Sequence, residues 1–290
     1  LGRREGREHA GDGAGGDVTF AIDERAEARM ESFLRERAPD VAFYSEDRGL
    51  VVPDASGGGA GPEWILVVDP IDGTRPAMAG LESACVSVAA ARYGEGRPTM
   101  ADVEVGLVIE IKSGERFLAV RGAGVEPAPA LGTVSSIERM LWTYGFRGRP
   151  AVDTTIVLEE LIDSSSVAGG TFDLGSATFD MTRIATGQMD AYVEPGPRIV
   201  EEVEGMRAEF ERVGHGAVLN NSPYDLAAAA LILEEAGAVV TDASGEPLGE
   251  RPLLGSGHEF QMSCVAAANP DLHAAIVAAI DRGIERLRER

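Results

Sequence analysis

Two aspartates three residues apart close the apolar run "WILVVDPIDGT", residues 64–74. A strand that ends in Asp-Pro delivers the Asp69 carboxylate to the end of a sheet, and the turn after it can place Asp72 beside it. Two carboxylates this close repel each other unless a cation lies between them, and oxygen-preferring Mg²⁺ is the expected ion. Gly73 permits close approach of backbone N–H groups, and Thr74 adds a hydroxyl at a helix start. The pattern therefore predicts metal and phosphoryl chemistry together.

The same residues also have a purely structural interpretation. Asp-Pro and Asp-Gly are common in turns, where Asp69 and Asp72 would act only as caps. The turn by itself leaves both interpretations open.

The elements expected to position this turn alternate between helix and strand. A strand over 64–69 precedes it, and a helix from Asp23 to Arg37 is closed by Pro39. Further strands are expected at 85–93, 103–111 and 116–122, and the last two are expected to form a hairpin through the turn "KSGE". A helix and strand are expected at 175–195, a capped helix and strand at 222–245, and an amphipathic helix at 272–287. This mixed order implies a layered α/β or α+β fold.

The chain has 290 residues, enough for one large domain or two subdomains. The segment "YGFRGRP" near residue 145 is the expected boundary between an N-terminal α+β subdomain, 1–145, and a C-terminal α/β subdomain, 146–290, that completes the site. Residues 196–221 form an expected insertion with a charged helical stretch. The Gly-rich residues 1–17 are expected to be a flexible lead-in.

The formal charge of −22 argues against nucleic acid or an anionic membrane as a partner, because like charges repel at long range. No apolar run approaches the roughly 20 residues that span a bilayer, and the N-terminal residues lack the apolar block of a signal peptide. We therefore expect a cytoplasmic protein. Cys85 and Cys264 lie in apolar surroundings and are expected to be reduced core residues.

Four separated motifs occur in the order typical of one enzyme family. They are Thr19 with Asp23, Ser45-Glu46-Asp47, the complete Asp69-Pro-Ile-Asp-Gly-Thr74, and Tyr224-Asp225-Leu-Ala-Ala228 followed by "EAGAVVTDASG". Over roughly residues 17–270 the chain resembles the inositol monophosphatase-like phosphatases, which include many bacterial and archaeal fructose-1,6-bisphosphatases. The resemblance implies an α+β layered sandwich with the order α-β-α-β-α.

Carried onto this chain, the resemblance implies a site for two or three Mg²⁺ ions. Glu46, Asp69 and the carbonyl of Ile71 would bind one ion. Asp69, Asp72 and Asp225 would bind a second, so that Asp69 bridges the two.

The resemblance also implies roles in catalysis and substrate binding. Thr74 with Asp23 would orient and help deprotonate a water that the metal binds, next to the ligand Glu46. The phosphate would contact Asp72, Gly73 and Thr74, while Ala177 and Glu194 would contact the hydroxyl-bearing body of the substrate.

Each of these carboxylates has a structural alternative. Asp225 is placed to close a capping box, and Asp23 to complement a helix dipole. Glu46 can be a solvated strand end, and Glu194 a simple loop carboxylate.

Arg75 and the insertion depart from the family pattern. Arg75 replaces the usual Asn after Asp-Gly-Thr, and it either contacts a substrate anion or points to solvent. The insertion carries Arg198, Arg207 and Arg212, which either reach the distal phosphate of a bisphosphate or belong to a solvated charged helix.

These features predict a Mg²⁺-dependent phosphomonoesterase for a small phosphorylated polyol or sugar, with inositol monophosphate and fructose 1,6-bisphosphate as the leading candidates, and a homodimer as its assembly. The alternatives are a nucleotide 3'-phosphatase and a non-catalytic protein of the same fold that binds a metal or a sugar phosphate.

Overall fold

The structure is a computed structural model that describes residues 9–12, 18–53, 61–94 and 96–290. The expected lead-in at 1–17 falls largely outside these residues. Within the lead-in, strand β1 (His9–Asp12) pairs with β2 (Val18–Phe20) in a two-stranded sheet. None of the described helices is long and apolar enough to cross a membrane.

A seven-stranded sheet with the order β4-β3-β5-β6-β7-β8-β9 carries the first half of the chain. Its strands are β3 (Ala42–Ser45), β4 (Gly49–Val51), β5 (Trp64–Asp72), β6 (Cys85–Arg92), β7 (Val103–Glu110), β8 (Arg116–Val120) and β9 (Gly124–Glu126). The expected strands at 85–93, 103–111 and 116–122 are confirmed, and β7 and β8 form the expected antiparallel hairpin. The strand expected to end at Asp69 instead continues to Asp72.

A five-stranded sheet with the order β11-β10-β12-β14-β13 carries the second half. Its strands are β10 (Leu141–Tyr144), β11 (Gly170–Phe172), β12 (Ala191–Glu194), β13 (Val239–Thr241) and β14 (Cys264–Ala267). The chain thus changes sheets between residues 126 and 141, and a division at 145 stays a prediction. Both halves contribute to one apolar core, because Phe179 and Leu231 pack in the same cluster as Val67 and Val108.

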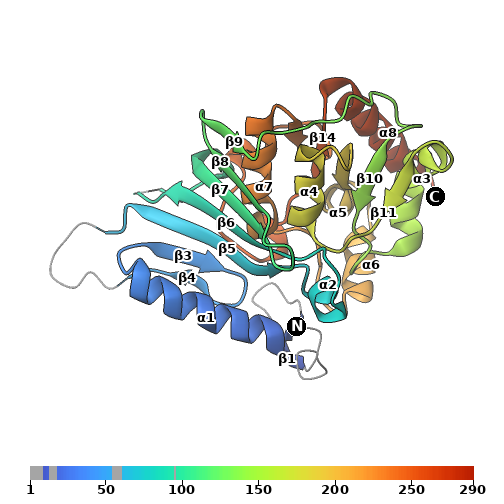
Figure 1. The fold of residues 1–290 in the computed structure, drawn as a ribbon. Coiled ribbons are helices and arrows are strands. Elements are labelled where there is room, and N and C mark those ends of the chain that lie inside the picture. The colour runs from blue at the N-terminus through green and yellow to red at the C-terminus, as the bar shows by residue number, and fades with distance from the viewer. Residues whose placement is uncertain (1–8, 13–17, 54–60, 95) are drawn as a thin grey trace.

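Helices separate and cover the two sheets (Figure 1). They are α1 (Ala21–Arg37), α2 (Thr74–Ala79), α3 (Ala151–Ser165), α4 (Ala177–Ala185), α5 (Gly196–Glu202), α6 (Met206–Val213), α7 (Pro223–Ala236) and α8 (Pro270–Arg288), with 3-10 turns at Met100–Asp102, Leu248–Glu250 and His258–Phe260. Helix α1 contacts β5, α7 and α4 lie between the sheets, and α3 and α8 pack together beyond the second sheet. This is the expected α-β-α-β-α order.

The C-terminal helix buries the expected apolar face. Leu272, Ile276, Ile280, Ile284 and Leu287 are all buried, and they pack against the five-stranded sheet and α3. The two cysteines are free and buried, as expected.

Helix α1 buries a charged residue. The Phe33 side chain is 51% exposed, whereas Glu27 is only 2% exposed. Glu27 is buried because Ser45 and Asp47 of the neighbouring β3–β4 turn hydrogen-bond to its carboxylate.

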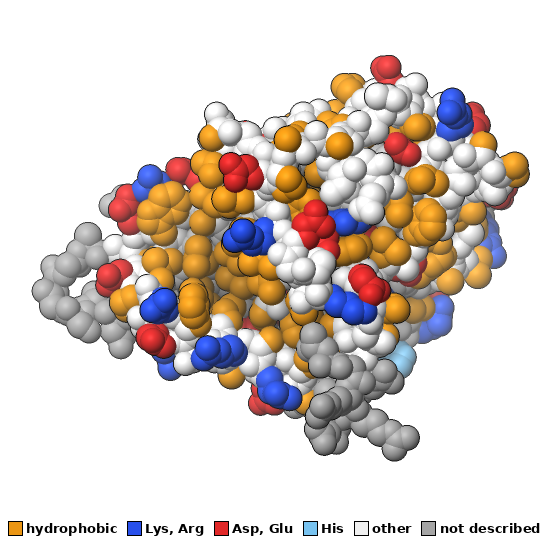
Figure 2. Space-filling model, in the orientation of Figure 1, with side chains coloured by type: hydrophobic (Ala, Val, Ile, Leu, Met, Phe, Trp, Pro, Cys, Tyr) orange, Lys and Arg blue, Asp and Glu red, His pale blue; other side chains and the backbone are white. Residues whose placement is uncertain are grey.

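One face of the seven-stranded sheet shows a concentration of hydrophobic side chains at the surface (Figure 2). This is the face that α7 does not cover, and the β8 side chains Leu118 and Val120 are 37% and 41% exposed. Helix α1 shields only the part near β5.

Candidate active site

A break in the register of β5 turns both of its aspartates toward one pocket. Residues three apart in a regular strand point to opposite faces, but the pairing of β5 with β6 is irregular between Asp69 and Asp72. The Asp69 carboxylate accepts a hydrogen bond from the Ile71 N–H at 2.9 Å, within this irregular segment. Ile71 lines the same pocket.

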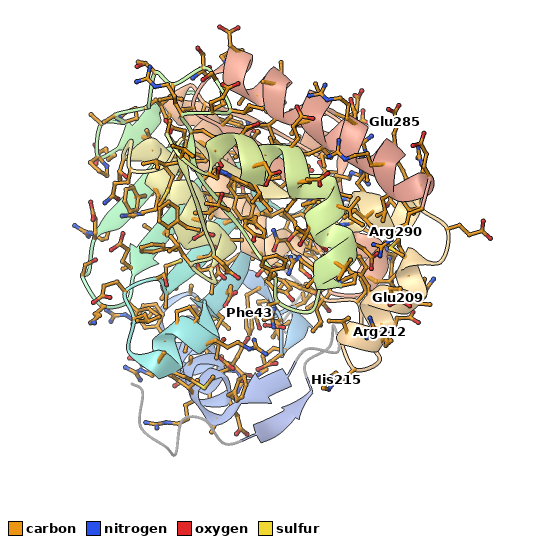
Figure 3. The ribbon with its side chains drawn as sticks, turned by 90° about the vertical axis from the view of Figure 1, so that its right-hand side faces the viewer. Phe43, Glu209, Arg212, His215, Glu285 and Arg290 are labelled. Atoms are coloured by element: carbon orange, nitrogen blue, oxygen red, sulfur yellow. The ribbon has the colours of Figure 1, made fainter. Side chains whose placement is uncertain are left out.

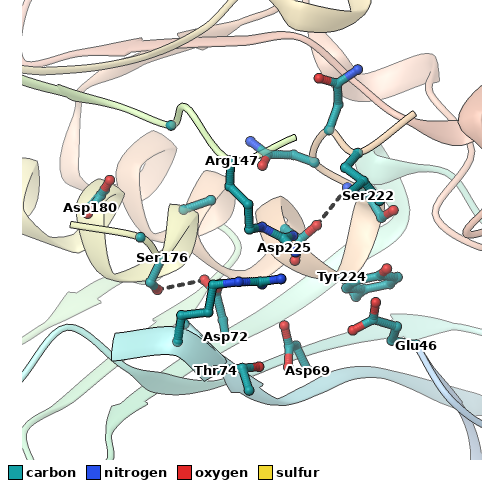
Figure 4. Close-up of a pocket in the computed structure, with 18 of the residues that line it drawn as sticks. Glu46, Asp69, Asp72, Thr74, Arg147, Ser176, Asp180, Ser222, Tyr224 and Asp225 are labelled. Carbon is teal, nitrogen blue, oxygen red and sulfur yellow. Dashed lines mark hydrogen bonds between the residues drawn. The ribbon is translucent and has the colours of Figure 1, made fainter. Parts of the chain in front are cut away.

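Asp225 completes a three-carboxylate cluster with Asp69 and Asp72. One oxygen of each lies within 4.8 Å of the others, although the residues come from β5 and from the first turn of α7. Asp225 also accepts a hydrogen bond from the Ser222 N–H at 2.7 Å, so it caps α7 and faces the pocket as well. Glu46, in the β3–β4 turn, lines the pocket near Asp69 (Figure 4).

The electrostatics of the cluster favour a divalent cation. Burial raises the pKa of Asp69 well above its ordinary value, and the charges of Asp72, Asp225 and Glu46 raise that pKa further. Burial also raises the pKa of Asp72, whereas hydrogen bonds from Thr178 and Ser176 lower it. Repelling carboxylates with oxygen donors directed to one point are the ligands that Mg²⁺ takes, so the residues fit this ion.

Asp72 is held in place by the start of α4. One of its oxygens accepts hydrogen bonds from the Ser176 hydroxyl at 2.8 Å and from the Thr178 N–H at 2.7 Å. The Ser176 hydroxyl oxygen in turn accepts from the Phe179 N–H at 3.1 Å. The second sheet's helix thereby orients a carboxylate of the first sheet.

Thr74 and Asp23 form the pair that the sequence predicts. The Thr74 hydroxyl donates to one oxygen of Asp23 at 2.9 Å, and the other oxygen accepts from the Phe20 N–H at 3.0 Å. Asp23 therefore caps α1 and also holds Thr74, and its part in catalysis stays a prediction.

Gly73 is required by the backbone between Asp72 and Thr74. Its φ is +88°, and a Cβ there would lie 2.6 Å from the Ser83 carbonyl oxygen. A side chain would be strained and would clash, which leaves the backbone of this turn open toward the pocket.

The two residues predicted to contact the substrate body lie in different places. Ala177, the first residue of α4, lines the pocket. Glu194 does not: its carboxylate is 1% exposed, forms an ion pair with Arg149 and accepts a hydrogen bond from the Gly196 N–H. Arg149 lines the pocket instead, and a direct contact of Glu194 with substrate stays a prediction.

Arg147 and Arg149 were not among the predicted site residues. Both come from the loop between β10 and α3, and both line the pocket. Their signal in the sequence was "YGFRGRP", in which two arginines stand in a glycine-containing turn after a strand. Arg75 lies at the exposed rim of the pocket, with its guanidinium 5.5 Å from the centre of the Phe20 ring.

The insertion folds as two helices, α5 and α6, rather than as one charged stretch. Its arginines form ion pairs elsewhere: Arg198 with Glu202 and Asp281, Arg207 with Glu211, and Arg212 with Glu209. None of the three lines the pocket, and Arg212 and Glu209 lie on the outer side of α6 (Figure 3). The insertion instead contributes Leu219, Asn220 and Asn221 to the pocket.

Glu27 is expected to position Glu46. Its carboxylate accepts hydrogen bonds from the Ser45 hydroxyl at 2.8 Å and from the Asp47 N–H at 3.4 Å, on both sides of Glu46. We expect Glu27→Gln to raise the Mg²⁺ concentration for half-maximal activity about 10-fold, the low end of what the loss of an orienting contact does to metal sites. The matched control is Glu24→Gln, an exposed residue of the same helix. An unchanged Mg²⁺ requirement in Glu27→Gln would refute this role.

The stability of the metal-free protein is expected to fall as pH rises. Because the pKa of Asp69 is raised above its ordinary value of 3.8, the folded protein retains a proton that the unfolded chain releases. Asp69 therefore destabilises the fold progressively as pH rises from about 4 through its raised pKa. Bound Mg²⁺ requires the ionised form, so its stabilising effect grows with pH, to about 2.7 kcal/mol at 100 times its dissociation constant. Thermal unfolding between pH 5 and 8, with and without Mg²⁺, measures this.

The comparison with Asp69→Asn isolates this contribution, because the amide does not titrate. If the difference between the two proteins did not vary with pH, the raised pKa of Asp69 would be excluded.

The layered fold carries an acidic pocket whose residues fit the chemistry of a metal-dependent phosphatase. A model of the inositol monophosphatase family matches residues 2–285. The chain belongs to the inositol monophosphatase family.

Individual relatives agree with this assignment. The chain is 30% identical over 288 residues to a fructose-1,6-bisphosphatase/inositol-1-monophosphatase from Methanothermobacter thermautotrophicus, covering 95% of this chain and 89% of the relative. It is 27% identical over 239 residues to a putative Nus factor SuhB from Neisseria meningitidis, covering 79% and 75%. The solved structure of an IMPase from Thermotoga maritima has the same fold, with a TM-score of 0.65, 22% identity, and coverage of 93% and 86%.

Proposed function

We propose that this protein is a Mg²⁺-dependent phosphomonoesterase that hydrolyses a small sugar or polyol phosphate. The observation that carries the proposal is the Asp69, Asp72 and Asp225 cluster beside the hydrogen-bonded pair of Thr74 and Asp23. Glu46, Asp69 and the Ile71 carbonyl would hold one ion, and Asp69, Asp72 and Asp225 another. Bound Mg²⁺ would supply Lewis-acid chemistry at the phosphate.

The protein's own residues have distinct parts in the proposed reaction. The Thr74 hydroxyl donates a hydrogen bond to Asp23. The lone pairs of its oxygen can therefore accept a hydrogen bond from a nucleophilic water and orient that water. Asp23, fixed by the Phe20 N–H, is the group that would take up the proton. The backbone N–H groups of Gly73 and Thr74 would contact the phosphate oxygens.

The names of the relatives limit the choice of substrate. The Methanothermobacter relative is named for both fructose 1,6-bisphosphate and inositol 1-phosphate, and we propose these two as leading candidates. The Neisseria relative is named as a Nus factor, which keeps a non-catalytic role as the competing proposal. The full set of carboxylates together with Thr74 favours catalysis.

Phosphate release from a panel of substrates tests the proposal. The panel holds inositol 1-phosphate, fructose 1,6-bisphosphate, fructose 6-phosphate, glycerol 2-phosphate and adenosine 3',5'-bisphosphate, each with Mg²⁺ and with a chelator. We expect Mg²⁺-dependent release from a sugar or polyol phosphate. A folded, Mg²⁺-loaded protein that released phosphate from none of them would overturn the proposal, and preference for the adenosine compound would favour the nucleotide 3'-phosphatase alternative.

We further propose a cytoplasmic homodimer, because dimers are common in this family. Light scattering on the purified protein measures the mass, and a monomer at micromolar concentration would contradict the proposed assembly.

A further inference from the structure

The end of the insertion forms a fixed wall of the pocket. The Gln261 amide donates to the Val218 carbonyl at 2.6 Å, and the Met262 N–H donates to the Asn221 carbonyl at 2.9 Å. The Asn221 amide donates to the Tyr192 hydroxyl at 2.5 Å. These contacts join the insertion to the segment before β14 and to β12. Asn220 is therefore held at the pocket between Val218 and Asn221, which both form hydrogen bonds to other segments.

Several polar atoms on this wall have no hydrogen-bond partner among the residues that the structure describes. Both amide atoms of Asn220, the Oε1 of Gln261 and the Nε of Arg149 are buried without a hydrogen bond. The three residues are 9%, 7% and 6% exposed, and all three line the pocket. Buried polar groups are almost always paired in native proteins, so unpaired groups that gather at one pocket indicate a bound polar partner.

Asn220 lies next to the residue predicted to contact the substrate body. A Cβ built on Gly196 would meet the Asn220 Oδ1 at 2.2 Å and the Glu194 Oε1 at 2.7 Å, so the amide packs beside the Glu194 carboxylate. Glu194 itself is occupied by Arg149 and by the Gly196 N–H. Asn220 and Arg149 therefore present polar atoms to the pocket in a region where Glu194 does not.

The charges on this side of the pocket do not suit a second phosphate. Arg149 forms an ion pair with Glu194, so the two together add no net charge. Arg147 points toward the carboxylate cluster (Figure 4), and the acidic Asp180 also lines the pocket. Two of the unpaired atoms, Asn220 Oδ1 and Gln261 Oε1, are acceptors, which repel phosphate oxygens but accept from hydroxyl groups.

We propose that Asn220, Gln261 and Arg149 form a subsite that binds the hydroxyl groups of an uncharged polyol or sugar body, so that the substrate carries only the phosphate that is hydrolysed. This inference rests on the proposed phosphatase function. A hydroxyl group both donates and accepts hydrogen bonds. Adjacent hydroxyls can therefore pair with the amide oxygens and with the N–H groups of this wall at the same time. Asn220, supplied by the insertion, is thereby a residue that determines specificity.

The test compares two substrates in one variant. We expect Asn220→Leu, which keeps the side-chain size, to lower kcat/KM for inositol 1-phosphate about 30-fold, because it removes paired donors and acceptors at a buried site. The same variant should retain kcat/KM for 4-nitrophenyl phosphate, which has no hydroxyls, within about 3-fold. Arg207→Ala, an exposed insertion residue that pairs with Glu211, is the matched control and should change neither.

Any other result would contradict either the proposed subsite or the proposed phosphatase function. Equal losses on both substrates would mean that Asn220 only supports the fold and would overturn the subsite. Wild-type preference for fructose 1,6-bisphosphate over fructose 6-phosphate and inositol 1-phosphate would overturn an uncharged body. No hydrolysis of any substrate, 4-nitrophenyl phosphate included, would refute the proposed function itself.

A second measurement does not depend on the folding of the variant. Wild-type protein should hydrolyse inositol 1-phosphate analogues that each lack one hydroxyl, and at least one of them should lose about 30-fold in kcat/KM. Equal rates for all analogues would overturn the subsite.

Discussion

Asp69→Asn is expected to lower kcat/KM for every phosphomonoester by about 1000-fold, the size of effect seen when a central electrostatic contact is removed from an active site. Asp69 is proposed to bridge two Mg²⁺ ions. It is central to the cluster, since the charges of Asp72, Asp225 and Glu46 all raise its pKa. An amide carries no charge and is a poor ligand for Mg²⁺. Initial rates of phosphate release at substrate concentrations below KM, with saturating Mg²⁺, measure the loss.

The fold is expected to survive this change. The amide oxygen can still accept from the Ile71 N–H, and the loss of one of the repelling charges should make the metal-free protein at least as stable at neutral pH. Asp40→Asn, at an exposed aspartate before β3, is the matched control and should keep full activity. Turnover in Asp69→Asn close to that of the wild type would reject the two-metal assignment.

Arg149→Met is expected to destabilise the fold by about 3–5 kcal/mol, because it leaves the Glu194 charge buried without its partner. Both residues are almost fully buried, at 6% and 1% exposed. Burial lowers the pKa of Arg149 to about 10, which still leaves the guanidinium protonated at neutral pH. The Gly196 N–H would still donate a hydrogen bond to the carboxylate. Urea unfolding at pH 7 measures the difference.

The double variant Arg149→Met with Glu194→Leu distinguishes the cost of an unpaired buried charge from the cost of lost packing. Replacement of both charges by apolar side chains should recover most of the lost stability, since the desolvation of the pair offsets much of its attraction. If the double variant were as unstable as Arg149→Met, the cause would be lost packing rather than an orphaned charge. A matched surface change, Arg212→Met at the exposed pair with Glu209, should shift stability by less than about 1 kcal/mol.

Short-range patterns predicted the elements well. The C-terminal helix, the Ser222 cap with Asp225, and the β7–β8 hairpin each depend on neighbouring residues and occur as expected. The strand end at Asp69 was wrong by three residues, because a proline usually closes a strand but here produces an irregular register. Helix α1 was placed correctly, but the burial of Glu27 could not be predicted, because its hydrogen-bond partners lie in another element.

By itself, the sequence determined the family, the layered fold and the carboxylates that can bind a metal. The reason is that Asp69-Pro-Ile-Asp-Gly-Thr74 and the capping box around Asp225 are local patterns whose geometry follows from a few adjacent residues. The resemblance to the family also paired Thr74 with Asp23, although 51 residues separate them.

Only the tertiary structure decided how the far side of the pocket is built. Arg149 and Glu194, 45 residues apart, neutralise each other, and the insertion delivers Asn220 in place of its arginines. The sequence does not show whether a charged or polar side chain will pair with another residue or stay available to bind a ligand. That outcome depends on which distant segments the packing of the two sheets brings together, and it is therefore fixed by the folded chain.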